Sequence, residues 1–262
     1  MVMLSRALVI LSAMFMVQAL PIVDQVEPVV SKAVAASAPK IRTGLLTKCK
    51  NAKHFALTFD DGPYQYTSAL IDLLDKQGVK ATFFINGNNY WSGSQINAPL
   101  QKAYKSGHQI ASHTFTHPSI PSLTAAQLKK EMYNNEQAIY KAIKKYPAVM
   151  RPPFGDVTDA NIKQLNGLGY SVVSWSLDVT DWDGNPTLAA EMKIVNDGLK
   201  DPANHNVILE HDVYKQTATQ LAPAVIKAVK AKGLTFVTMA ECKLMKFRGL
   251  GVDAYKSTGI KL

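Results

Sequence analysis

Several common features are missing from this sequence, and each absence narrows what the chain can be. No Asn-X-Ser/Thr sequon occurs in its 262 residues, so N-glycosylation is not expected. Residues 249–262 contain no apolar tail, which leaves a lipid anchor at that end unsupported. No linker, repeat or low-complexity tract follows residue 45. We therefore expect one domain over residues 46–245 and a C-terminal extension over residues 246–262.

The apolar stretch at the N-terminus, residues 7–17, is too short to span a membrane comfortably. Arg6 precedes it with a positive charge, and residues 17–19 form a small-residue cleavage site. We predict a secretory signal peptide over residues 1–19, with an N-terminal anchor helix as the alternative. Residues 20–45 lack periodicity and are predicted to be flexible or a pro-segment. The protein is then expected to be secreted, extracellular or in a cell wall, with no membrane span in the mature chain.

Cysteine is scarce, and the two that are present, Cys49 and Cys242, flank the predicted domain. In an exported chain an even number of cysteines indicates a disulfide, and two free buried thiols are the alternative. Acidic residues are also in deficit, since 20 Asp and Glu oppose 29 Lys and Arg. The lysines are scattered at helical spacing, which is typical of solvated helix faces. We therefore expect no nucleic-acid partner. We also expect the protein to be a monomer.

Short apolar runs alternate with longer helical patterns from about residue 55 onward. Strands are predicted at 55–60, 80–85, 109–113, 149–152, 171–177, 207–211 and 235–238, and helices at 67–77, 95–106, 124–145, 158–167, 187–200 and 218–232. Thr124 is the expected N-cap of the clearest helix. Seven alternations favour an α/β fold whose mostly parallel sheet is closed, or nearly closed, into a barrel.

Two motifs place carboxylates and imidazoles at the ends of predicted strands. Thr-Phe-Asp-Asp-Gly-Pro (58–63) ends the first strand, and His-Thr-Phe-Thr-His (113–117) ends the third. One carboxylate and two imidazoles are a sufficient protein shell for a catalytic zinc, which keeps one position open for water. The second carboxylate is then available as a general base. Together the two motifs predict metal-assisted hydrolysis, although the first motif alone is also typical of a surface turn.

Three further polar residues, Arg151, Asp178 and His211, also end predicted strands, where a barrel carries its active site. An arginine beside the base would hold it ionised and oriented, with a surface ion pair as the alternative. His211 is placed to protonate a leaving amine, and Asp178 is available to fix its tautomer, although a strand-end histidine is often only structural. Among the aromatic residues, Trp182 beside Asp181 is the best candidate for stacking on a sugar ring.

These blocks resemble carbohydrate esterase family 4, the polysaccharide deacetylases, and most of all its secreted fungal chitin deacetylases. Besides the two motifs above, the matching blocks are Arg-Pro-Pro-Phe-Gly (151–155), the segment 178–182 and Leu-Glu-His-Asp (209–212). The resemblance covers residues 50–242. It implies a single-domain, distorted barrel of about seven parallel strands. It also implies a divalent metal, usually zinc, with Co²⁺ as another possibility.

The resemblance implies a role for each matching residue. Asp60 corresponds to the base, Arg151 to the residue that positions it, and Asp61, His113 and His117 to the metal ligands. His211 corresponds to the acid, oriented by Asp178, while Leu209 and Trp182 contact the substrate. Phe154 stands where many members have Tyr, but the role there belongs to the backbone N–H. Glu210 occupies a position that is more often small or apolar, and it should face away from His211.

The activity that this resemblance implies is hydrolysis of N-acetyl groups in chitin or chitooligosaccharides. An acetylxylan esterase or a peptidoglycan deacetylase is the alternative within the same chemistry, because the substrate is chosen by loops that the sequence does not decode. A polysaccharide-binding protein without catalysis is the alternative from another class. The complete set of base, acid and metal ligands speaks against it, since a binding protein needs none of them.

Overall fold

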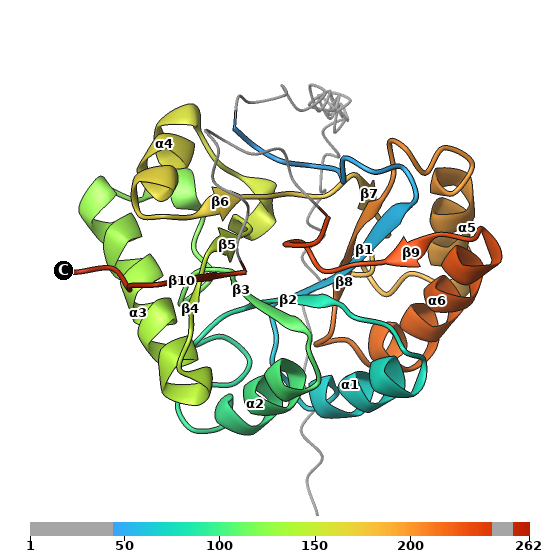
Figure 1. The fold of residues 1–262 in the computed structure, drawn as a ribbon, viewed down its shortest axis with the longest axis horizontal. Coiled ribbons are helices and arrows are strands. Elements are labelled where there is room, and N and C mark those ends of the chain that lie inside the picture. The colour runs from blue at the N-terminus through green and yellow to red at the C-terminus, as the bar shows by residue number, and fades with distance from the viewer. Residues whose placement is uncertain (1–43, 243–253) are drawn as a thin grey trace, which may run out of the picture. The chain divides into compact units, whose positions relative to one another are not determined.

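A curled parallel sheet runs through the part of the chain that the computed structural model describes, residues 44–242 and 254–262 (Figure 1). Its hydrogen-bonded order is β6-β5-β3-β2-β1-β8-β7, every neighbouring pair is parallel, and β9 adds to β1. The strands are β1 (His54–Asp60), β2 (Thr82–Ile85), β3 (Gln109–Ser112), β5 (Val149–Met150), β6 (Ser171–Val172), β7 (Leu177–Asp178), β8 (Val207–His211) and β9 (Thr235–Phe236). The α/β barrel with about seven parallel strands is thereby confirmed.

The barrel is distorted at the place where the predicted strand 171–177 breaks into two. The backbone N–H of Ser174 bonds to Leu46 O on one side, whereas the N–H of Ser176 bonds to Val207 O on the other. The chain therefore leaves β6 and joins β8 through β7, so that β6 and β7 are the two open ends of the sheet. A continuous apolar run predicts a strand but carries no signal for a change of partner.

Helices surround the sheet, as Figure 1 shows, and each follows a strand as the alternation predicts. They are α1 (Thr67–Lys76), α2 (Asn97–Lys105), α3 (Ala125–Ile143), α4 (Asp159–Gly167), α5 (Leu188–Gly198) and α6 (Ala222–Ala231), with a π-helical turn, η3 (Thr217–Leu221), before α6 and short 3₁₀ turns η1 (Ile120–Ser122) and η2 (Pro153–Gly155). Thr124 caps α3 as predicted, through a reciprocal capping box with Gln127. None of these helices is both long and apolar enough to cross a membrane.

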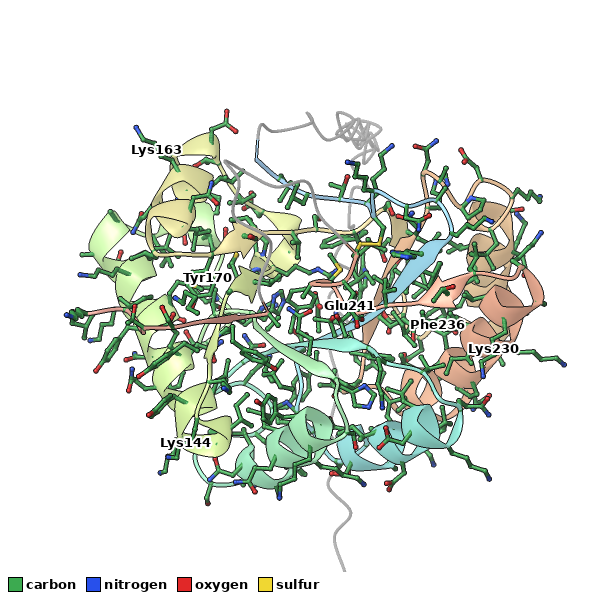
Figure 2. All side chains as sticks on the ribbon, in the orientation of Figure 1. Lys144, Lys163, Tyr170, Lys230, Phe236 and Glu241 are labelled. Atoms are coloured by element: carbon green, nitrogen blue, oxygen red, sulfur yellow. A yellow bond between two sulfur atoms is a disulfide. The ribbon has the colours of Figure 1, made fainter. Side chains whose placement is uncertain are left out.

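The alternation of side chains along β1 separates two apolar layers. Phe55, Leu57 and Phe59 pack in the layer between the sheet and the helices, whereas Ala56 belongs to a smaller cluster with residues of the other strands. That second cluster also contains the Cys49–Cys242 disulfide, which confirms the predicted pairing and is drawn in yellow in Figure 2. Figure 2 also shows surface lysines spread over separate helices and turns, among them Lys144, Lys163 and Lys230.

Residues 254–262, within the predicted C-terminal extension, pack on the domain. β10 (Tyr255–Lys256) pairs antiparallel with β4 (Tyr146–Pro147). Buried Glu136 of α3 accepts a hydrogen bond from the Ile260 N–H (2.7 Å) and forms an ion pair with Lys256. This part of the extension is therefore joined to the domain by a buried charge pair.

We expect Glu136→Ala to destabilise the protein by about 3–5 kcal/mol, because it leaves the nearly buried ammonium of Lys256 without its carboxylate. Denaturant unfolding measures this change. The control is Lys141→Ala, which alters an exposed residue of the same helix and should change the free energy of unfolding by less than about 0.5 kcal/mol. A loss below about 1 kcal/mol in the Glu136 variant would show that this ion pair does not hold the segment.

Candidate active site and metal centre

The site lies at the carboxyl edge of the sheet, where β5, β3, β1 and β8 each end in, or are directly followed by, a polar residue. Asp60 ends β1 and His211 ends β8, and these two residues are paired in register. His113 follows β3 directly, and Arg151 follows β5. Because parallel strands finish at the same edge, residues separated by up to 151 positions in sequence meet there.

Asp61, His113 and His117 come together as a candidate metal centre, with one ligand atom of each within 4.8 Å of the others. Asp61 Oδ1 lies 3.5 Å from His113 Nε2 and 3.2 Å from His117 Nε2. The φ of Asp61 is 74°, so the chain turns at this residue, and Asp60 Oδ2 and Asp61 Oδ1 both lie near His113 Nε2, at 3.7 and 3.5 Å. Adjacent residues of a regular strand point to opposite faces, so the left-handed turn at Asp61 is what lets both carboxylates reach one site.

The donor set fits a divalent cation. Asp61 Oδ1 is buried and has no hydrogen-bond partner, which leaves it available to a metal ion. Burial raises the pKa of this carboxyl, but the imidazole of His117, and then those of His113 and His211, outweigh burial and lower the pKa to about 2. The carboxylate is therefore ionised at any ordinary pH, as a metal ligand must be.

The ring of His113 has the tautomer that a metal ligand needs. Its Nδ1 lies 2.7 Å from the carbonyl oxygen of Arg151, so Nδ1 carries the proton and the lone pair of Nε2 faces Asp61. Burial lowers the pKa of His113, which favours the neutral imidazole. His113 is thus held in the form that binds a cation.

The loop between the two histidines is not helical, although a spacing of four residues is one helical turn. Thr114 and His117 have left-handed backbones, with φ of 69° and 59°. Glu131 of α3 accepts hydrogen bonds from the N–H groups of Phe115 (2.9 Å) and Thr116 (2.8 Å), which fixes the loop against the helix. The imidazoles therefore meet through a tied loop and not through one face of a helix.

Asp60 is held by a fully buried arginine. Arg151 Nη1 donates to Asp60 Oδ1 (2.7 Å) and to Thr58 Oγ1 (2.8 Å), and Nη2 donates to the Ser174 carbonyl (3.2 Å). The guanidinium carbon also lies 4.1 Å from the centre of the Phe84 ring. One oxygen of Asp60 is thereby committed to Arg151, while Oδ2 lies 3.7 Å from His113 Nε2 and faces the metal centre.

The carboxylate that orients His211 is Asp181, and the prediction of Asp178 for this contact is wrong. Asp181 Oδ1 lies 2.7 Å from His211 Nδ1, and Asp181 Oδ2 accepts the backbone N–H of His211 at 2.7 Å. Asp178 instead accepts hydrogen bonds from Thr180 N–H (2.9 Å) and Trp182 Nε1 (3.3 Å). Position at a strand end favours Asp178, but the left-handed turn at Thr180 brings the later carboxylate to the ring.

Burial lowers the pKa of His211, but the hydrogen bond and charge of Asp181, with Asp60 and Asp61, outweigh it and raise the pKa to about 9. An acid must carry its proton, so activity should fall as the pH rises through this pKa. We expect Asp181→Asn to start that fall at a lower pH, because the variant loses the anion that favours imidazolium. The pH profile of kcat measures the shift. Asp178→Asn should leave the pH of this fall unchanged. A shift in the Asp178 variant and none in the Asp181 variant would identify Asp178 as the orienting group.

Aromatic side chains contact several of these residues. Phe154 has φ of 59°, is 68% exposed, and its ring centre lies 4.6 Å from that of His117. Trp182 is 52% exposed, whereas Leu209 is buried on β8. The sequence did not predict a second aromatic group, in which the ring of Tyr64 contacts those of Tyr66, Tyr90 and Trp91. The ring of Tyr214 lies beside that of His211. The sequence does carry a sign of this group. Tyr64, Tyr66 and Tyr214 closely follow site motifs, and Tyr90 and Trp91 lie in the loop after β2.

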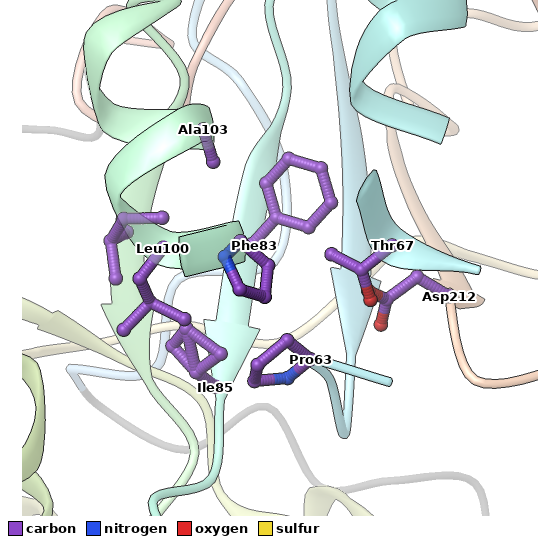
Figure 3. Close-up of a pocket in the computed structure, with 9 residues that line it drawn as sticks. Pro63, Thr67, Phe83, Ile85, Leu100, Ala103 and Asp212 are labelled. Atoms are coloured by element: carbon purple, nitrogen blue, oxygen red, sulfur yellow. The ribbon is translucent and has the colours of Figure 1, made fainter. Parts of the chain in front are cut away.

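Two further buried carboxyls surround this edge. Glu210 is fully buried, its oxygens have no hydrogen-bond partner, and burial raises its pKa well above the usual range. Asp212 accepts a hydrogen bond from Thr67, and a Cβ at Gly62 would overlap its carboxylate, which explains the glycine after Asp61. Figure 3 shows Asp212 and Thr67 beside a mostly apolar pocket between β2 and α2, whose lining does not include Asp61, His113 or His117.

Comparisons with known proteins agree with this geometry. Residues 47–173 match the family model of the polysaccharide deacetylases. A chitin deacetylase of Colletotrichum lindemuthianum is 34% identical over 205 residues, which cover 75% of this chain and 82% of that protein. The chain belongs to carbohydrate esterase family 4, the polysaccharide deacetylases.

Other members of the family are similar over comparable lengths. A chitin deacetylase of Pestalotiopsis sp is 40% identical over 199 residues, which cover 76% of this chain and 66% of the relative. The solved structure of the chitin deacetylase from Colletotrichum lindemuthianum superposes with a TM-score of 0.73 at 31% identity, and covers 80% of this chain and 96% of that one. Polysaccharide deacetylases of this family are metal-dependent hydrolases, which suits the Asp61, His113 and His117 centre.

Proposed function

We propose that this polysaccharide deacetylase removes N-acetyl groups from N-acetylglucosamine residues of chitin or chitooligosaccharides and releases acetate. The observation that carries the proposal is the convergence of a base, an acid and a cation site at one sheet edge. Asp60 borders the candidate metal centre, and His211 is the register partner of Asp60 on the neighbouring strand β8. Both relatives described above are chitin deacetylases.

The division of labour follows from the contacts. A divalent ion held by Asp61, His113 and His117, which we propose to be zinc, would polarise the acetyl carbonyl and acidify a water. Asp60 accepts the proton of the attacking water through Oδ2, because Arg151 holds its other oxygen and fixes the orientation of the carboxylate. The backbone N–H of Phe154 donates to the oxyanion. His211 then gives its proton to the departing amine, which is a poor leaving group without it.

The exposed aromatic faces support a saccharide substrate. Phe154, beside His117, and Trp182 are exposed, and Tyr90 and Tyr64 form an aromatic cluster (5.1 Å between ring centres). Flat apolar faces beside polar groups are the usual means of holding a sugar ring in a concave site. We also propose that the protein is secreted and acts as a monomer. The predicted signal peptide and residues 20–43 lie outside the described residues.

Acetate release from chitin oligomers, acetylxylan and peptidoglycan, each with and without a chelator, tests the proposal. We expect release from chitin oligomers, loss of that release with the chelator, and recovery on adding zinc. Release from peptidoglycan alone would reassign the substrate, and a peptidoglycan N-acetylglucosamine deacetylase of Bacillus cereus is 30% identical over 72% of this chain. Zinc binding without release from any substrate would identify a polysaccharide-binding protein.

A further inference from the structure

The carboxylate of Asp181 has a third partner besides the ring and the backbone of His211. Its Oδ2 accepts a hydrogen bond from Thr217 Oγ1 at 2.8 Å, next to the bond from the His211 N–H at 2.7 Å. Thr217 is fully buried and Asp181 is nearly so. The two bonds on Oδ2 fix the plane of the carboxylate, and thereby the direction in which Oδ1 meets the His211 ring.

The position of Thr217 comes from the π-helical turn η3. Ala218 N–H bonds to the Tyr214 carbonyl, and neighbouring Gln216 is tied to the Pro186 carbonyl (2.8 Å) and to Glu191 (2.9 Å). The turn is thus anchored on both sides of the threonine. Such π-turns recur at functional sites in proteins.

The same turn contains a second threonine with a different use of its hydroxyl. Thr219 Oγ1 donates to the Lys215 carbonyl at 2.7 Å, a local bond four residues back along the chain, and it is exposed. The hydroxyl of Thr217 donates to Asp181 instead. The hydrogen bond of Thr219 therefore stays within the turn, whereas that of Thr217 reaches Asp181, the carboxylate that orients His211.

Asp181 is almost fully buried, so its oxygens need hydrogen-bond donors. Two buried carboxyls, Glu210 and Glu191, lie near enough that the charge of Asp181 contributes to raising the pKa of both. A buried carboxylate is stable only when hydrogen-bond donors reach its oxygens. The hydroxyl of Thr217 is the side-chain donor on Oδ2, next to a backbone donor that cannot be replaced.

We propose that Thr217 is a positioning residue for proton donation by His211, acting through Asp181. The inference rests on the proposed function, in which His211 protonates the departing amine. Loss of the Thr217 hydroxyl should slow only those substrates whose leaving group needs a proton, because Thr217 acts through the acid His211. Binding of substrate and of metal should be unaffected.

The test uses the zinc-loaded enzyme with two substrates, a chitin oligomer and an aryl acetate whose phenolate leaves without protonation. Thr217→Val should lower kcat on the oligomer by roughly 10-fold or more, with KM and the ester rate within about twofold of the parent. Thr217→Ser keeps the hydroxyl and should restore most of the rate. Thr219→Val makes the same change in the same turn and should leave both rates unchanged.

A spectroscopic measurement separates failure of this inference from failure of the proposed function. The His211 Nδ1–H proton, bonded to Asp181, should give a downfield NMR resonance in the parent and in Thr217→Ser, and the resonance should weaken or move in Thr217→Val. If the parent releases no acetate from the oligomer, the proposed function fails, and the resonance still tests the contact. Equal losses on both substrates, or an unchanged resonance with unchanged rates, would overturn the role of Thr217. Should the valine variant not fold, Thr217→Ala against Thr217→Ser gives the same comparison.

Discussion

Replacing His117 with alanine should abolish tight metal binding and reduce acetate release by at least about 10³-fold, while the protein stays folded. His117 supplies one of three ligand atoms, and two ligands do not hold a catalytic cation in position. Its side chain is 19% exposed and lies in a loop outside the apolar clusters, so its removal leaves the core intact. Metal content after dialysis and circular dichroism measure the two effects separately.

The left-handed backbone of His117 requires a matched control. A φ of 59° is disfavoured for alanine, so part of any change could come from the backbone. Asn tolerates this region better, and His117→Asn should therefore lose metal with less effect on stability. His205→Ala removes a histidine outside the site and should retain both metal and activity. If His117→Ala bound zinc as tightly as the parent, the metal centre would lie elsewhere.

The parts of the fold that sequence predicts well are those in which local pattern and packing agree. In α3 the apolar stripe that includes Leu128, Met132 and Ile139 is buried, and Thr124 caps the helix as its side chain favours. The strand-end position of Asp60, His113 and other polar residues likewise follows from alternation of strand and helix, because a parallel barrel brings such ends together.

The errors arise where the chain turns. Asp178 and Asp181 are three residues apart, and only the backbone conformation of Thr180 decides which of them reaches His211. The division of 171–177 into β6 and β7 likewise depends on which carbonyls the N–H groups of Ser174 and Ser176 find. Neither outcome has a periodic signal, since the first depends on a local left-handed turn and the second on hydrogen-bond partners far along the chain.

Asp60 and Asp61 are chemically identical neighbours, and substituting each with asparagine should separate their roles. Asp60→Asn should keep the metal and lose roughly 10²–10⁴-fold in rate, the usual worth of a positioned general base. The amide oxygen can still accept the hydrogen bond of Arg151, but the amide cannot take a proton from water. Asp61→Asn should instead weaken metal binding, because it removes the charged oxygen that lies between the two imidazoles.

Excess zinc distinguishes the two variants. It should recover part of the activity of Asp61→Asn, whose defect is occupancy, and none of the activity of Asp60→Asn, whose defect is proton transfer. Arg151 contacts only the first of the two carboxylates, so Arg151→Lys, which keeps the buried charge but loses the forked geometry, should resemble the Asp60 variant. Metal content and acetate release at limiting and saturating zinc are the decisive measurements. Rescue of Asp60→Asn by metal, with Asp61→Asn unresponsive, would reverse the assignment of base and ligand and make the proposed mechanism wrong.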